Sequence, residues 1–163
     1  MKRWIAAAAL LLAALPAAAE DAQPPAAKEP KLDIPAAKAA HDYGFAGLMA
    51  RDNRVDLPPL TLSAGKPVAQ GVYTLKSGTY YRIDITSDGT QELALSGGDF
   101  FRAIWINEIV INSIEIRPMG IHSIEFDEAG TAHVSFIAIL PGTYKLSVPQ
   151  SRGGSQAATF VIQ

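Results

Sequence analysis

Cysteine is absent from all 163 residues of this sequence. This absence excludes disulfide bonds, thiolate metal ligands, a cysteine nucleophile and lipid attachment through an N-terminal cysteine. The fold must therefore be stabilised by packing and hydrogen bonding alone.

Basic residues and catalytic motifs are also scarce. The 14 Lys and Arg are outnumbered by 16 Asp and Glu, and nucleic-acid binding requires a clustered basic surface, so we expect no nucleic-acid partner. Gly-x-Ser-x-Gly, P-loop and His-Glu-x-x-His motifs are missing. The acidic residues are scattered and lack the close spacing of a catalytic pair. We therefore expect that the protein is not an enzyme.

The N-terminus has the pattern of a secretory signal peptide. Lys2 and Arg3 precede an apolar run over residues 4–15, and residues 17–19 form an Ala-x-Ala cleavage site. The run of about twelve residues is too short to cross ~30 Å of hydrocarbon at 1.5 Å per residue. We expect residues 1–19 to be cleaved and the mature protein to be periplasmic, with no transmembrane segment.

A spacer is expected after the signal peptide, over residues 20–54. Residues 20–40 are rich in Ala, Pro, Lys and Glu, which is typical of a disordered tether. Residues 41–54 contain several larger apolar residues and fit either one or two turns of helix or an edge segment packed on the domain. The folded domain is expected to occupy residues 55–163.

Residues 55–163 have the pattern of an all-β domain. Residues 80–86 alternate, with Tyr81, Ile83 and Ile85 on one face and polar residues on the other, as in a strand with one wet side. Turn sequences separate about seven or eight such runs. This spacing predicts a Greek-key β-sandwich.

Two regions carry more specific structural expectations. Residues 121–126 and 131–139 flank the turn sequence Asp-Glu-Ala-Gly, which predicts a β-hairpin. The β-branched and aromatic residues of 100–116 predict a strand region that is buried on both faces.

The C-terminal part of the chain resembles the cupredoxins, the copper-binding Greek-key family that includes azurin and plastocyanin. The resemblance is carried by the Pro-Gly-Thr-Tyr turn at residues 141–144, the strand that follows it, and the run Thr-Phe-Val-Ile at 159–162. Residues 60–67 and 80–90 resemble the early strands of the family. The resemblance covers most of residues 58–163 and implies a cupredoxin-like sandwich.

The type 1 copper ligands of that family are not retained. Such a site needs a thiolate and two imidazoles, usually with an axial Met. The resemblance places the first His position near Glu92, the Cys position at Val148, the second His position near Ser151 and the Met position near Gln156. We therefore expect no type 1 copper and no electron transfer of the usual cupredoxin kind.

Met119 and His122 form the candidate metal site. A thioether and an imidazole suit copper, and His41 or Met49 folding back would supply a further ligand. The alternative is that both residues belong to a loop between strands, where Met fills a gap and His is half-exposed. His133 alternates with apolar neighbours in a predicted strand, so we expect it to point to solvent.

The stretch 97–107 contains the candidate partner-binding residues. Two glycines precede Phe100, Phe101, Arg102 and Trp105, and aromatic and Arg side chains dominate interface hot spots. The alternative is that Phe100 and Trp105 cap one end of the core.

Together these features predict a periplasmic, cupredoxin-like binding or accessory protein with an envelope protein as partner. No cofactor is expected apart from possible copper at Met119 and His122. One alternative function is copper binding or electron transfer through that Met/His site. A second alternative is a structural interaction module of the cell envelope.

Overall fold

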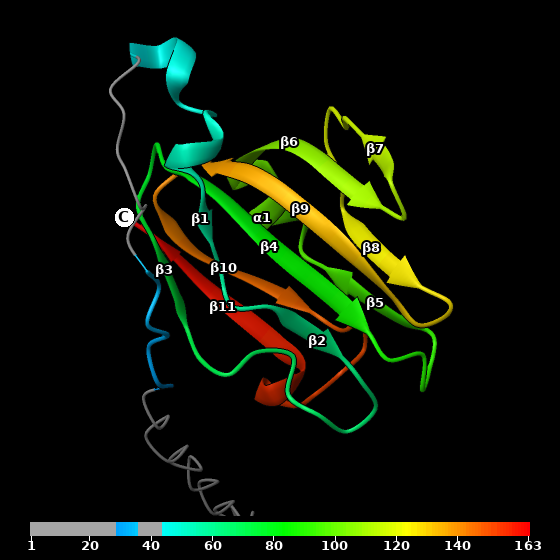
Figure 1. The fold of residues 1–163 in the computed structure, drawn as a ribbon. Helices are drawn as coiled ribbons and strands as arrows, with labels where there is room; N and C mark the ends of the chain where they lie inside the picture. The colour runs from blue at the N-terminus through cyan, green and yellow to red at the C-terminus, as the bar shows by residue number, and fades with distance from the viewer. Residues whose placement is uncertain (1–28, 36–43) are drawn as a thin grey trace, which may run out of the picture.

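The computed structural model of the protein describes residues 29–35 and 44–163. The predicted signal peptide, most of the predicted spacer and His41 lie outside these ranges. The described residues form two β-sheets, one α-helix and three short 3-10 helices (Figure 1). The helices are α1 (Gly98–Ala103), η1 (Gly44–Gly47), η2 (Arg51–Asn53) and η3 (Gly154–Gln156).

The first sheet has six strands in the order β1-β4-β9-β6-β7, with β2 beside β4. They are β1 (Val55–Asp56), β2 (Leu60–Leu62), β4 (Tyr80–Ser87), β6 (Ile104–Ile111), β7 (Ile114–Ile116) and β9 (Gly130–Ala138). The second sheet has the order β3-β11-β10-β5-β8. Its strands are β3 (Tyr73–Leu75), β5 (Leu93–Ser96), β8 (Ser123–Phe126), β10 (Gly142–Ser147) and β11 (Ala157–Ile162).

The core lies between the two sheets. In β4 the predicted alternation is confirmed: Tyr81, Ile83 and Ile85 are buried, while the polar residues between them face outward. Phe100 of α1 reaches both sheets, because its ring centroid lies 5.9 Å from that of Phe136 in β9 and 4.3 Å from that of Phe160 in β11. The short helix therefore closes one side of the sandwich with an aromatic side chain.

The predicted all-β sandwich is confirmed, with eleven strands in the described part of the chain. More strands are present than the pattern indicated, because β1 and β7 have only two and three residues and are too short to show a period. The chain crosses repeatedly between sheets, and β2 with β4 and β3 with β11 are parallel pairs.

The predicted hairpin over residues 121–139 is wrong. β8 pairs with β5 in the second sheet, whereas β9 pairs with β4 and β6 in the first. The turn at 127–129 thus carries the chain from one sheet to the other. A four-residue turn sequence looks the same in both cases, because the choice of partner strand depends on contacts far away in the sequence.

The prediction of a doubly buried region over 100–116 is wrong at both ends. Phe100 and Phe101 belong to α1 instead of a strand, and all three residues of β7 are exposed. β7 is the last strand of its sheet and pairs with β6 alone. Ile114 accordingly keeps 65% of its surface exposed.

Part of the predicted spacer is packed against the domain. Lys31 forms a parallel bridge with Val72, and the amides of Leu32 and Val72 donate to Val72 and Pro30 carbonyls at 3.0 and 2.8 Å. Leu32 and Ile34 lie against the core. These are the two larger apolar residues of the stretch, and both are half-buried, so their apolar contacts hold residues 29–35 against the domain. Residues 44–53 form the helical turns η1 and η2, one of the two expected conformations.

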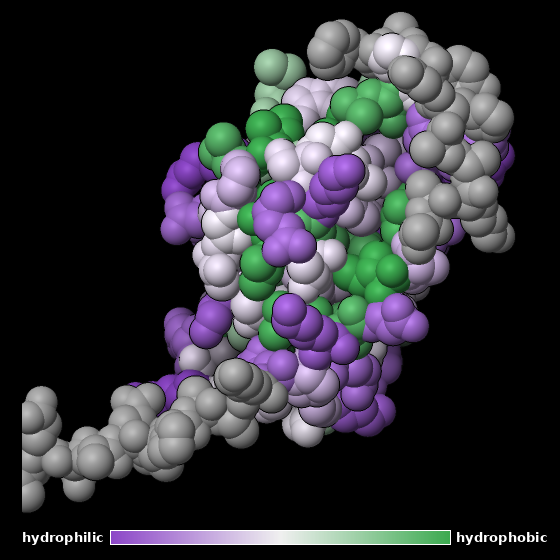
Figure 2. Space-filling view, turned by 90° about the vertical axis from the view of Figure 1, so that its left-hand side faces the viewer, coloured by the Kyte–Doolittle hydropathy of each residue, from purple (hydrophilic) through white to green (hydrophobic). Residues whose placement is uncertain are grey.

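On the face seen in Figure 2, hydrophobic residues reach the surface as separate patches between hydrophilic ones. None of the helices in the described ranges is long and apolar enough to cross a membrane.

Candidate functional site

The four positions that correspond to copper ligands gather at one end of the second sheet. β5 and β10 are antiparallel, so Glu92, just before β5, and the loop after β10 lie at the same end. This loop is closed by its own hydrogen bonds: the Val148 amide donates to the Gln156 carbonyl at 2.9 Å, and the Ser151 hydroxyl donates to the Val148 carbonyl at 2.6 Å. The Gln156 side-chain amide donates to the Lys66 carbonyl at 2.9 Å.

These residues do not fit a type 1 copper ion. One carboxylate, one aliphatic chain, one hydroxyl and one amide stand where a thiolate, two imidazoles and a thioether are needed. The amide of Gln156 is moreover occupied by Lys66. Across the described ranges, no group of three or more His, Cys, Asp or Glu side chains is arranged to hold a metal ion.

Met119 and His122, the candidate metal ligands, lie in the loop between β7 and β8 and are exposed. Met119 has its whole side chain in solvent, with a relative exposure of 106%. The His122 ring lies over the start of α1, where a Cβ atom on Gly98 would come within 2.9 Å of its Cδ2. His122 therefore contacts the helix that carries the candidate partner-binding residues.

The candidate partner-binding residues divide between core and surface. Phe100 and Phe101 are buried, at 2% and 5% exposure, so neither ring is available to a partner. Arg102 and Trp105 are exposed. Arg102 forms an ion pair with Asp99 at 2.5 Å. The alternative expectation holds for Phe100, which packs in the core, but not for Trp105, which lies on the outer face of β6.

A groove of about 570 Å³ lies between α1 and β10. Its α1 wall includes Arg102 and Ala103, and its other walls include Leu140, Thr143 and Lys145. The amide of Leu140 donates to the Ala103 carbonyl at 2.9 Å, which fixes the β9–β10 connection to the end of the helix. Leu140 is 52% exposed.

The edge of β10 that faces this groove is largely unpaired. β10 pairs with β5 at a single position, Ser147 with Ser96, and within the described residues no backbone hydrogen bond joins α1 to β10. The Lys145 carbonyl points to this edge, toward Gly97. A Cβ atom added to Gly97 would lie only 2.4 Å from the carbonyl oxygen. Backbone groups of alternate residues share an edge, so those of Thr143 also face the groove.

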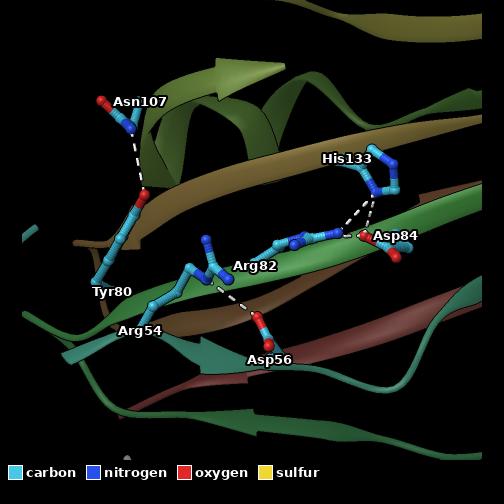
Figure 3. Close-up of polar contacts among 7 residues, drawn as sticks. All are labelled: Arg54, Asp56, Tyr80, Arg82, Asp84, Asn107 and His133. Carbon is cyan, nitrogen blue, oxygen red and sulfur yellow. Dashed lines mark hydrogen bonds and ion pairs between the residues drawn. The ribbon is translucent and has the colours of Figure 1, made fainter. Parts of the chain in front are cut away.

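A second cluster of polar side chains lies on the outer face of the first sheet (Figure 3). Arg82 and Asp84 of β4 project beside His133 of β9, whose Nδ1 lies 2.7 Å from the Asp84 carboxylate. His133 lies on the outer, solvent side of the sheet, as the sequence predicted, but it is only half-exposed because it packs against these neighbours. Arg54 follows η2 and pairs with Asp56 of β1 at 3.1 Å.

Sequence reasoning missed both the groove and this cluster. The groove depends on how α1 lies against β10, and no motif encodes that placement. The cluster joins residues from β4, β9 and the segment from the end of η2 to β1, which are far apart in the sequence. The only local signal is the outward position of Arg82 and Asp84 in the alternation of residues 80–86.

No family model and no curated protein matches the chain. Among solved structures it is similar to a multicopper oxidase, with 6% identity and a TM-score of 0.47 over 69% of this chain and 44% of that one. It is similar to the copper nitrite reductase from Nitrosomonas europaea, with 16% identity and a TM-score of 0.45 over 57% and 33%. It is also similar to a multi-copper oxidase from Pseudomonas Thermotolerans, with 17% identity and a TM-score of 0.44 over 63% and 24%.

The matched region spans less than half the length of each of these structures. The TM-scores are all below 0.5, so what this chain does is inferred from its own residues.

Proposed function

We propose that this chain is a periplasmic binding or accessory protein, not an enzyme, and that it holds an extended, acidic segment of an envelope protein in the groove between α1 and β10. The observation that carries the proposal is the unpaired edge of β10 along that groove. An exposed strand edge is a template for a further strand.

The groove offers both main-chain and side-chain contacts to such a segment. Gly97 already lies against the Lys145 carbonyl, so Thr143 presents the backbone groups with which an added strand would form hydrogen bonds. The cations Arg102 and Lys145 flank the groove against one carboxylate, Asp99, which favours an acidic segment. The exposed side chain of Leu140 supplies an apolar contact.

The copper-ligand positions support a binding role over electron transfer. Glu92, Val148, Ser151 and Gln156 lack the donors of a type 1 site, and the loop that contains three of them is closed by its own hydrogen bonds. The polar groups of this loop are therefore used in hydrogen bonds that hold its own conformation, at the end of the sheet where the resemblance would place a metal.

Site-specific photo-crosslinking in the periplasm of expressing cells tests this function. A photoreactive residue at Thr143, whose side chain is exposed, is expected to yield a discrete crosslinked adduct. The same residue at Glu128, in the exposed turn before β9, is the matched control and should yield none. Lys145→Glu is expected to abolish the adduct at position 143 through charge repulsion. Equal crosslinking at both positions, or an adduct unaffected by Lys145→Glu, contradicts the proposal.

Copper binding by Met119 and His122 is the second candidate function. The full exposure of Met119 favours it, because its thioether is a soft ligand that is accessible to a soft metal ion such as Cu(I). Titration of the mature protein with Cu(I) and Cu(II), followed by calorimetry and absorption, separates the two functions. Stoichiometric binding that His122→Ala abolishes would establish copper binding, whereas His133→Ala should leave such binding unchanged.

A further inference from the structure

We propose that the outer face of the first sheet contains a binding site for a small oxyanion, one that carries a carboxylate or phosphate group. The site is a cavity of about 190 Å³ between η2 and strands β4, β9 and β6. Its polar lining consists of Arg51, Arg54, Arg82, Glu108, His133 and Ser135. The volume equals that of about six waters, which suits a small anion and is too small for a peptide strand.

The charge of the lining favours an anion. The lining contains three arginines and one carboxylate, that of Glu108, which Arg117 approaches at 3.3 Å. Arg54 and Arg82 are paired with aspartates beside the cavity, so Arg51 is the lining cation that has no ion pair among the described residues. The side chains of Arg54 and Arg82 are only 16% and 30% exposed. A partly buried cation is stabilised by each additional anionic partner, because water solvates it incompletely.

The neighbouring aspartates leave the end-on donors of both arginines directed toward such a partner, although Nη2 of Arg82 also lies 3.0 Å from Nδ1 of His133. Arg54 uses Nε to pair with Asp56 at 3.1 Å, and Arg82 uses Nε to pair with Asp84 at 3.2 Å. The paired terminal nitrogens of a guanidinium match the two oxygens of a carboxylate or phosphate group. The neighbouring aspartates therefore orient the two guanidinium groups without occupying that edge.

The position of His133 leaves Nη2 of Arg82 without a suitable hydrogen-bond acceptor. Nδ1 of His133 lies 3.0 Å from Nη2 of Arg82 and 2.7 Å from Oδ1 of Asp84. Figure 3 shows the His133 ring beside both side chains. Arg only donates and an ionised carboxylate only accepts, so Nδ1 cannot satisfy both neighbours at once. An oxyanion beside Arg82 accepts from Nη2 and leaves Nδ1–H free to donate to Asp84.

Ser135 supplies a donor in the same cavity. The residue is 2% exposed and lines the cavity beside Arg82 and His133. A serine hydroxyl can donate a hydrogen bond. An oxygen of the bound anion can therefore accept from Ser135 as well as from Arg82.

Calorimetric titration of the mature protein with sodium phosphate and, separately, sodium succinate tests the site, with ionic strength held constant by chloride. We expect saturable binding of at least one anion to a single site, and the anion that binds identifies the favoured group. Charged hydrogen bonds contribute about 1.5–3 kcal/mol, so Arg51→Gln and Arg54→Gln should each weaken binding about tenfold or more. Arg152→Gln, at an exposed position in the loop between β10 and β11, is the matched control and should have no effect.

Glu108→Gln provides an independent test, because it should strengthen binding about threefold to tenfold by removing the opposing charge. A gain of affinity cannot arise from misfolding, which protects the interpretation if Arg54→Gln proves unstable. The proposal is overturned if neither anion binds saturably, or if the affinity is the same in Arg51→Gln, Glu108→Gln and the parent protein.

Discussion

Asp88 is an exposed residue whose acid–base behaviour is set by its immediate neighbours. It lies in the turn after β4, where the Thr90 amide and hydroxyl donate to its Oδ1 at 3.0 and 2.7 Å. Hydrogen bonding to the Ser63 side chain is the largest influence, followed by these bonds from Thr90 and by the charge of Lys66, and together they lower the pKa of Asp88 to about 2. Each of these contacts favours the ionised carboxylate.

The free energy of unfolding should therefore depend on Asp88 in acid. The folded-state pKa lies below the unfolded value of about 3.9, so the contribution of this group is complete above about pH 4 and is lost as the pH falls through about 2. Asp88→Asn should flatten the pH dependence of stability between pH 4 and 2, measured by urea unfolding at several pH values. Asp127→Asn, in another exposed turn, should keep the parent slope. Parallel curves for Asp88→Asn and the parent would contradict the prediction.

At the scale of elements, the N-terminal segment 29–35 depends on a close backbone approach to the start of β3. A Cβ atom on Gly71 would lie 2.2 Å from the Pro30 carbonyl oxygen. Backbone atoms cannot move aside as a flexible side chain can, so only glycine permits this contact. The segment is thereby attached to the second sheet through the bridge between Lys31 and Val72.

Gly71→Ala should displace this segment from the sheet. We expect a loss of about 1–3 kcal/mol in the free energy of unfolding and faster amide hydrogen exchange at Leu32 and Val72, whose amides bond across this contact. Gly120→Ala is the matched control, because a Cβ there meets no atom within 4 Å. Unchanged exchange at Leu32 in Gly71→Ala would show that the segment is not attached in this way.

The whole molecule is held together by apolar contacts between its sheets. Phe100 contacts one aromatic ring in each sheet, Phe136 and Phe160, and its side chain is fully buried. Tyr73 stacks on Phe160 with centroids 4.7 Å apart, and its burial raises the pKa of its hydroxyl far above the usual value. Because the chain contains no cysteine, this packing substitutes for covalent links between the sheets.

Phe100→Ala should lower the free energy of unfolding by about 3–5 kcal/mol, because it removes apolar contacts and leaves a cavity between the sheets. Trp105→Ala, which truncates an aromatic residue that is 46% exposed, should cost less than about 1 kcal/mol. Chemical denaturation of the two variants measures the difference. Similar losses in both variants would mean that Phe100 does not bridge the sheets as described.

The sequence by itself determined the features that depend on local chemistry. The alternation of residues 80–86 assigned the buried face of β4 correctly, because side chains of a strand point to opposite faces with a period of two. The residues at the copper-ligand positions likewise follow from the sequence, since Val148 and Gln156 have no thiolate or imidazole in any conformation.

Only the tertiary structure decided which distant residues meet. The turn before β9 is followed by a change of sheet, and its sequence does not distinguish that from a hairpin. Phe100 and Phe101 were candidates for a surface patch, but the placement of α1 puts them in the core. The cavity beside Arg54, Arg82 and His133 depends on the pairing of β4 with β9 and on the position of η2. Such contacts are chosen by the packing energy of the complete sandwich, which no short stretch of sequence contains.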